Sequence, residues 1–108
     1  MTPAEVAALI GERAAWGYSR ASGPGGQRRD HAETRAELTV RRGDLDGLPE
    51  ALAGRLVDAL GLDARPLRLT SQAQRSRERN REVVLARLRL LAAAMEVRSY
   101  NVVEWDDQ

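Results

Sequence analysis

The sequence contains no cysteine, no lysine and no phenylalanine, and its only aromatic residues are two tryptophans and two tyrosines. Without cysteine, disulfide bonds and thiolate metal sites are excluded. With so few aromatic side chains, the core must be built from aliphatic ones. No apolar run approaches the ~20 residues of a membrane span, and the N-terminus lacks the layout of a secretory signal. We therefore expect a cytoplasmic protein with no membrane partner.

The charge of the chain is unevenly distributed. All 17 basic residues are arginine, whose planar guanidinium suits bidentate contacts with phosphate, although a GC-rich coding bias also explains the absence of lysine. The net charge is +1, but residues 96–108 hold four acidic residues against one arginine, which leaves about +4 on the rest. A basic body with an acidic end is compatible with an RNA partner without requiring one.

Two segments have the features of helices with defined ends. Thr2, Pro3 and Glu5 combine a capping side chain, a proline at the first helical position and a capping-box acid, which predicts a helix over residues 3–14. The longest predicted helix runs over residues 76–95. Its expected apolar seam consists of Val84, Leu88, Leu91 and Met95, widened by Leu85 and Ala92.

Alternation of apolar and polar residues predicts three short strands, over residues 16–20, 35–41 and 67–70. A second helix is predicted between Pro49 and Gly61, with an apolar face of Leu52, Leu56, Ala59 and Leu60. One helical turn is predicted within residues 28–34. Residues 100–103 are expected to form a last strand or to pack loosely. The 108 residues therefore indicate one α+β domain, a small β-sheet with helices packed on one face, a long C-terminal helix and an acidic tail over 96–108.

The segment most informative about function is the loop Ser22-Gly23-Pro24-Gly25-Gly26-Gln27. Three glycines in four residues allow positive φ angles and let another molecule approach the backbone without meeting a Cβ atom. A glycine-rich loop alone is more often a flexible connection. The Rossmann and Walker patterns do not fit, because their strand, loop and helix spacing is missing and the chain has no lysine.

Two motifs together resemble a known family. Residues 20–27, followed by Glu33-Thr34 and a strand, resemble the catalytic loop of class I peptide-chain release factors. The stretch Arg75-Ser76-Arg77-Glu78-Arg79-Asn80-Arg81-Glu82 is similar to the Arg-Ser-x-Glu-x-Asn-Arg-Glu signature of the small members, such as alternative ribosome-rescue factor B. The motifs stand in the family's order, and the resemblance covers roughly residues 16–95.

This resemblance implies a release-factor type of domain that hydrolyses peptidyl-tRNA on stalled ribosomes without reading a codon. It implies Gln27 as the catalytic residue, with Gly25 and Gly26 permitting the required backbone conformation. The expected partners are peptidyl-tRNA and the rRNA of the peptidyl-transferase centre, and the protein is expected to be a monomer off the ribosome. No metal or cofactor is implied. The arginines expected to contact RNA are Arg20, Arg28, Arg29, Arg75, Arg77, Arg79 and Arg81.

Two departures from the family keep a second hypothesis open. The family usually reads His-Val-Asn-Lys after the glutamine, where this chain has Arg28-Arg29-Asp30-His31, and rescue factors usually end in a basic tail. A non-catalytic ribosome-binding or RNA-binding module that retains the fold is therefore the alternative. We interpret His31 as a solvated or loop-bracing side chain. The cluster of Arg75, Arg77, Arg79 and Arg81 also has a purely structural interpretation. It is then a solvated helix face with the ion pairs Glu78–Arg81 and Glu82–Arg79.

Overall fold

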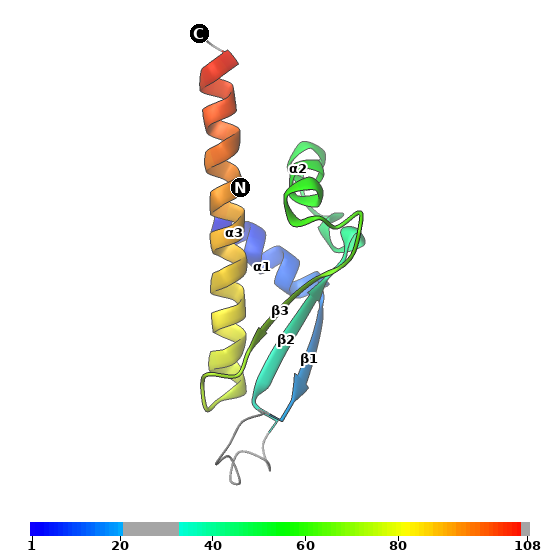
Figure 1. Cartoon of the computed structure of the whole chain (residues 1–108), viewed down its shortest axis with the longest axis vertical. Coiled ribbons are helices and arrows are strands. Elements are labelled where there is room, and N and C mark those ends of the chain that lie inside the picture. Colours follow the sequence, from blue (N-terminus) through cyan, green and yellow to red (C-terminus); the bar gives the residue numbers. More distant parts are fainter. Residues whose placement is uncertain (21–32, 107–108) are drawn as a thin grey trace.

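The protein is an α+β domain with a three-stranded antiparallel sheet in the order β1-β2-β3 (Figure 1). The computed structural model describes residues 1–20 and 33–106, with side chains described as far as Met95. The predicted loop at 22–26 and most of the predicted turn at 28–34 lie outside these residues. The elements in chain order are α1 (Pro3–Arg13), β1 (Ala15–Ser19), β2 (Arg35–Val40), the 3-10 helix η2 (Arg42–Leu45), α2 (Glu50–Leu60), β3 (Leu67–Ser71) and α3 (Arg77–Asp106).

The sheet buries one face and exposes the other, as the alternation in the sequence predicts. In the central strand β2, Ala36, Leu38 and Val40 are fully buried. In the paired registers, Trp16 of β1 and Leu69 of β3 lie on either side of Leu38, on the same face. The helix α3 packs against β2 and β3, and Figure 1 shows it running alongside the sheet. The apolar face of the sheet is thus covered by helix, while the alternate residues face solvent.

Helix α1 begins with the predicted capping box. The Glu5 N–H donates to Thr2 Oγ1 over 3.1 Å, and the Thr2 N–H donates to Glu5 Oε1 over 3.2 Å. The bond from the Thr2 backbone, together with the Thr2 side chain, lowers the pKa of Glu5. Val6 and Ile10 are buried one turn apart and face the core, so this helix is anchored as the sequence predicts.

Helix α2 has the expected ends but a slightly rotated face. Pro49 precedes its first residue, and Gly61 ends it with φ of 68°, a left-handed conformation that glycine adopts without strain. Leu56 and Val57 are the buried residues, whereas Ala59 is exposed, so including Ala59 in the apolar face was wrong. The buried stripe is centred between Leu56 and Val57, and an alanine is small enough to be tolerated on the outer side.

Helix α3 follows the predicted seam except at one position. Val84, Leu88, Ala92 and Met95 are buried, at intervals of four, four and three residues. Leu91 is 38% exposed, so its place in the seam was wrong. Neighbouring residues point about 100° apart on a helix, and it is Ala92 that faces inward at this level.

Residues 96–106 continue α3 as a helix, and the expected last strand is therefore wrong. No glycine or proline interrupts the chain after Met95, and each added helical residue gains a backbone hydrogen bond once the helix exists. At 30 residues, α3 is ~45 Å long, and its last turns run past α2 (Figure 1). Over residues 1–20 and 33–106, no helix is both long and apolar enough to cross a membrane.

The seam of α3 leads to a stability prediction. We expect Leu88→Ala to lower the free energy of unfolding by about 2–5 kcal/mol, because it leaves a cavity against the sheet. The matched control is Leu90→Ala, at a position that is 64% exposed, where a change within about 0.5 kcal/mol is expected. Urea unfolding of both variants measures the difference. Equal effects would show that Leu88 does not carry the packing of α3.

Candidate functional site at the start of the long helix

The predicted functional residues divide into two groups. Gly25, Gly26 and Gln27 lie outside the described residues, as do Arg28, Arg29 and His31. The structure describes both flanks of this segment. Ser19 ends β1, Arg35 begins β2, and the two are paired across the sheet, so the two flanks leave the sheet side by side. Figure 1 shows the start of α3 at the same end of the sheet.

Asn80 is the polar centre of this end of the molecule. Its side chain is fully buried and joins three segments through hydrogen bonds. Its Nδ2 donates to the Thr34 carbonyl over 2.6 Å and to the Gln74 carbonyl over 3.1 Å. Its Oδ1 accepts from Ser71 Oγ over 2.9 Å and from the Gln74 N–H over 3.0 Å. The end of β3, the connection before α3 and the residue preceding β2 are therefore held by one side chain.

Two arginines of α3 stack on two aromatic rings of β1. The Arg77 guanidinium lies 4.7 Å from the Tyr18 ring centre, and the Arg81 guanidinium lies 4.7 Å from that of Trp16. The two rings are 6.3 Å apart and nearly parallel, at 5°. Both arginines are exposed to solvent and flank the sheet. We call these four side chains the arginine-aromatic ladder.

The geometry of the ladder follows from the repeats of the two elements. Four residues along an α-helix rise about 6 Å, and two residues along a strand rise about 6.6 Å. The spacing of two arginines four residues apart on a helix is therefore close to that of two aromatic residues two apart on a strand. Helix α1 also fixes one ring of the ladder, because Trp16 Nε1 donates to the Gly11 carbonyl of α1 over 2.8 Å. The stacked guanidinium groups are thus held in place before any partner arrives.

The arginines at this helix start form no ion pairs with the acids that stand among them in the sequence. Neither Glu78–Arg81 nor Glu82–Arg79 forms an ion pair; within the described side chains, the ion pair is Arg42–Asp63. The alternative interpretation, a solvated face with these two ion pairs, was wrong in the ion pairs, although the four side chains are exposed. The α3 backbone adds its own positive end, which favours anions and disfavours cations. Arginines clustered there raise the local positive potential, as a site for phosphate groups requires.

The other predicted arginines that the structure describes are near the same end of the domain in the chain. Arg20 directly follows β1, Arg75 precedes α3 and Arg79 lies in its first turn, and all three are exposed. Ser76 caps this turn, its Oγ accepting from the Arg79 N–H over 3.1 Å. Within the described part of the chain, no cluster of His, Asp and Glu is arranged to hold a metal ion.

Sequence reasoning missed the residues that organise this site. Trp16 and Tyr18 were interpreted only as strand residues. Asn80 was interpreted only as one position of the Arg75–Glu82 motif, with no structural role. A signal was present in the spacing, since aromatic residues at i and i+2 on a strand fit arginines at i and i+4 on a helix. The signal could not be used before the two elements were known to be neighbours.

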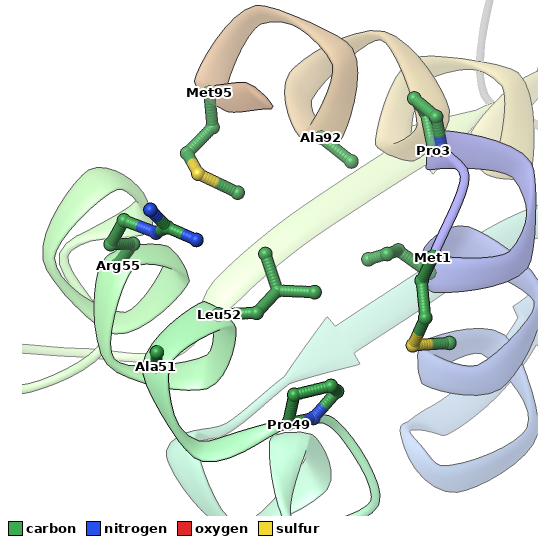
Figure 2. Close-up of a pocket in the computed structure, with 9 residues that line it drawn as sticks. Met1, Pro3, Pro49, Ala51, Leu52, Arg55, Ala92 and Met95 are labelled. Carbon is green, nitrogen blue, oxygen red and sulfur yellow. The ribbon is translucent and has the colours of Figure 1, made fainter. Parts of the chain in front are cut away.

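An apolar pocket of about 280 Å³ lies elsewhere, between α1, α2 and α3. Figure 2 shows Leu52, Met1 and Met95 around this space, with Arg55 at its edge. Its α3 residue Ala92 is twelve residues beyond Asn80, or ~18 Å along the helix. The pocket is therefore separate from the candidate site.

Asn80 is expected to stabilise the fold strongly. Asn80→Ala leaves the buried Ser71 hydroxyl and the Thr34 carbonyl without their partner, so we expect the free energy of unfolding to fall by about 2–5 kcal/mol. Ser71→Ala is the matched control, with an expected loss of about 1 kcal/mol, because Asn80 Oδ1 keeps the Gln74 N–H. Chemical denaturation of both variants tests this. A smaller effect for Asn80→Ala than for Ser71→Ala would contradict the central role of the amide.

Comparison with known proteins assigns no family to this chain. A scan against protein-family models found no match, and a search of the curated proteins found no significant match. The resemblance to release factors accordingly depends on the two motifs and on their positions in the chain. The function must be argued from the residues and from the contacts among them.

Proposed function

We propose that this chain hydrolyses the ester bond of peptidyl-tRNA on the ribosome and thereby releases nascent peptide from stalled complexes. One observation supports the proposal most. Residues of the second motif, Arg77 and Asn80, contact the carbonyls of Glu33 and Thr34, which lie six and seven residues after Gln27, the last residue of the first motif. Residues that follow the first motif therefore contact residues of the second, as the flank of a single site would.

The proposed chemistry needs no ionisable side chain. A water oxygen bonds to the carbonyl carbon, the bond from that carbon to the ribose oxygen breaks, and a proton is transferred to the ribose oxygen. In the transition state, negative charge develops on the carbonyl oxygen and on the leaving ribose oxygen. The Gln27 backbone N–H donates to the leaving ribose oxygen, in the way an oxyanion-hole donor acts. The Gln27 side chain restricts access to water, and Gly25 and Gly26 permit the conformation.

In this proposal, the arginine surface binds ribosomal RNA. Arg77 and Arg81 lie over their rings and remain exposed to solvent. A guanidinium group forms bidentate contacts with phosphate oxygens through its N–H groups. Because the rings already hold the guanidinium groups, less side-chain entropy is lost on binding. Arg20, Arg75 and Arg79 add positive charge around the same helix start.

A non-catalytic RNA-binding module is the second candidate. The acidic residues after Met95 and the altered residues after Gln27 favour it, because neither feature matches the rescue factors that the motifs resemble. The two functions share the arginine surface and differ only in the chemistry of the loop. Substitutions in the loop therefore distinguish them.

Gly26→Ala is expected to slow peptide release at least about a hundredfold while ribosome binding stays nearly unchanged. The added methyl group obstructs the backbone conformation that the Gln27 N–H needs, an effect comparable to loss of an oxyanion donor, and it removes no charge. Gly43→Ala is the control, because a Cβ there meets nothing within 4 Å.

Single-turnover release and binding should be measured on the same stalled, stop-codon-programmed and split ribosomal complexes. If the wild-type protein binds but releases no peptide from any of them, the RNA-binding module is correct. If Gly26→Ala is as fast as the wild type, this loop is not the active site.

A lysine substitution tests the ladder without changing the charge. We expect Arg81→Lys to weaken ribosome binding about two- to fivefold, because stacking on Trp16 and the bidentate edge are lost. The matched control Arg79→Lys has no such ring beneath it and should change binding less. The salt dependence of binding should be the same for both variants, since each keeps its positive charge. Equal loss in both would show that stacking contributes nothing to the affinity.

A further inference from the structure

We propose that Asn80 and Arg77 are positioning residues for the segment that contains Gly25, Gly26 and Gln27, an inference that depends on the proposed function. Neither side chain is assigned a part in the chemistry. Their role is to hold the C-terminal flank of that segment at a set place relative to α3. Glu33 and Thr34 are thereby kept in one spatial relation to the arginines that would bind rRNA.

The first support is that two consecutive carbonyls are held from the same helix. Arg77 Nε donates to the Glu33 carbonyl over 3.2 Å, and Asn80 Nδ2 donates to the Thr34 carbonyl over 2.6 Å. Residues three apart lie on the same side of an α-helix. Two consecutive residues of the flank therefore accept hydrogen bonds from two side chains on the same side of α3, more than forty residues away in the sequence.

The second support is the rigidity of each donor. Asn80 is fully buried, and its other three hydrogen bonds go to Ser71 and to the Gln74 backbone. Its amide therefore has one orientation in which all partners are satisfied. Arg77 is held by the Tyr18 ring, which belongs to β1 and lies just before the N-terminal flank. Together the two residues connect α3 with both flanks of the segment.

The third support comes from the kind of catalysis proposed. A backbone N–H acts only from the right place, and a displacement of about 1 Å is able to cost on the order of a hundredfold in rate. The sheet pairs the two flanks with each other at Ser19 and Arg35, and α3 packs against β2. The contacts of Arg77 and Asn80 with the Glu33 and Thr34 carbonyls extend this placement beyond the first residue of β2, on the side of the segment.

The test compares Asn80→Ser with Ser71→Ala in the whole 108-residue chain. A serine at position 80 is too short to reach the Thr34 carbonyl, whereas Ser71→Ala breaks the same network on its far side and leaves that bond intact. We expect Asn80→Ser to lower the single-turnover release rate at saturating protein about tenfold or more. The half-saturating concentration should change little, and Ser71→Ala should match the wild-type rate. Amide hydrogen exchange at residues 33–35 should be faster in Asn80→Ser than in Ser71→Ala.

The outcomes separate the inference from the proposed function. If the wild type releases peptide and folded Asn80→Ser releases it equally fast at saturation, the positioning role is wrong and the proposed function stands. If the wild type releases none, the proposed function fails, and the positioning role fails with it.

Should Asn80→Ser not fold, Arg77→Gln is compared with Arg81→Gln. Both lose one stacked charge, but only Arg77 contacts the Glu33 carbonyl. A lower saturating rate for Arg77→Gln than for Arg81→Gln supports the inference, and equal rates overturn it.

Discussion

The buried amide of Asn80 is the interaction on which the arrangement of the α3 start against the sheet depends. A side-chain amide has two donors and two acceptor sites, and all four are used by Asn80, whose partners are Thr34, Ser71 and Gln74. In the described part of the chain, no buried side-chain nitrogen or oxygen lacks a partner. A polar group buried in this way is stabilising only if every bond is made, so it admits one arrangement of the start of α3 against the sheet.

The same arrangement explains why arginines gather where a helix dipole disfavours them. The α3 start combines a positive backbone end with four arginines from Arg75 to Arg81, and the nearby Glu78 and Glu82 do not pair with them in the expected way. Stacking on Tyr18 and Trp16 supports two of these cations. A polyanion that approached this surface would find charge that is concentrated, ordered and not yet neutralised.

Local signals were sufficient for most of the fold. The capping box at Thr2, the glycine at position 61 and the alternation around Leu38 depend on interactions within a few residues, and each was predicted at the right place. Errors arose where a distant element decided the outcome. Whether Leu91 or Ala92 faces inward depends on how α3 is rotated against its neighbours, which no periodicity in a single helix determines.

The sequence by itself determined the candidate chemistry, because both motifs are short and continuous in the chain. The backbone freedom of Gly25 and Gly26 before Gln27, and the charge of the Arg75–Glu82 motif, follow from the residue types alone. It also determined that an amphipathic sheet and three helices would form. Only the tertiary structure decided that Asn80 holds Thr34 and that Arg77 and Arg81 lie over Tyr18 and Trp16. These contacts join residues that are far apart in the chain. Their distances follow from how α3 docks on the sheet, which is set by the packing of the whole core.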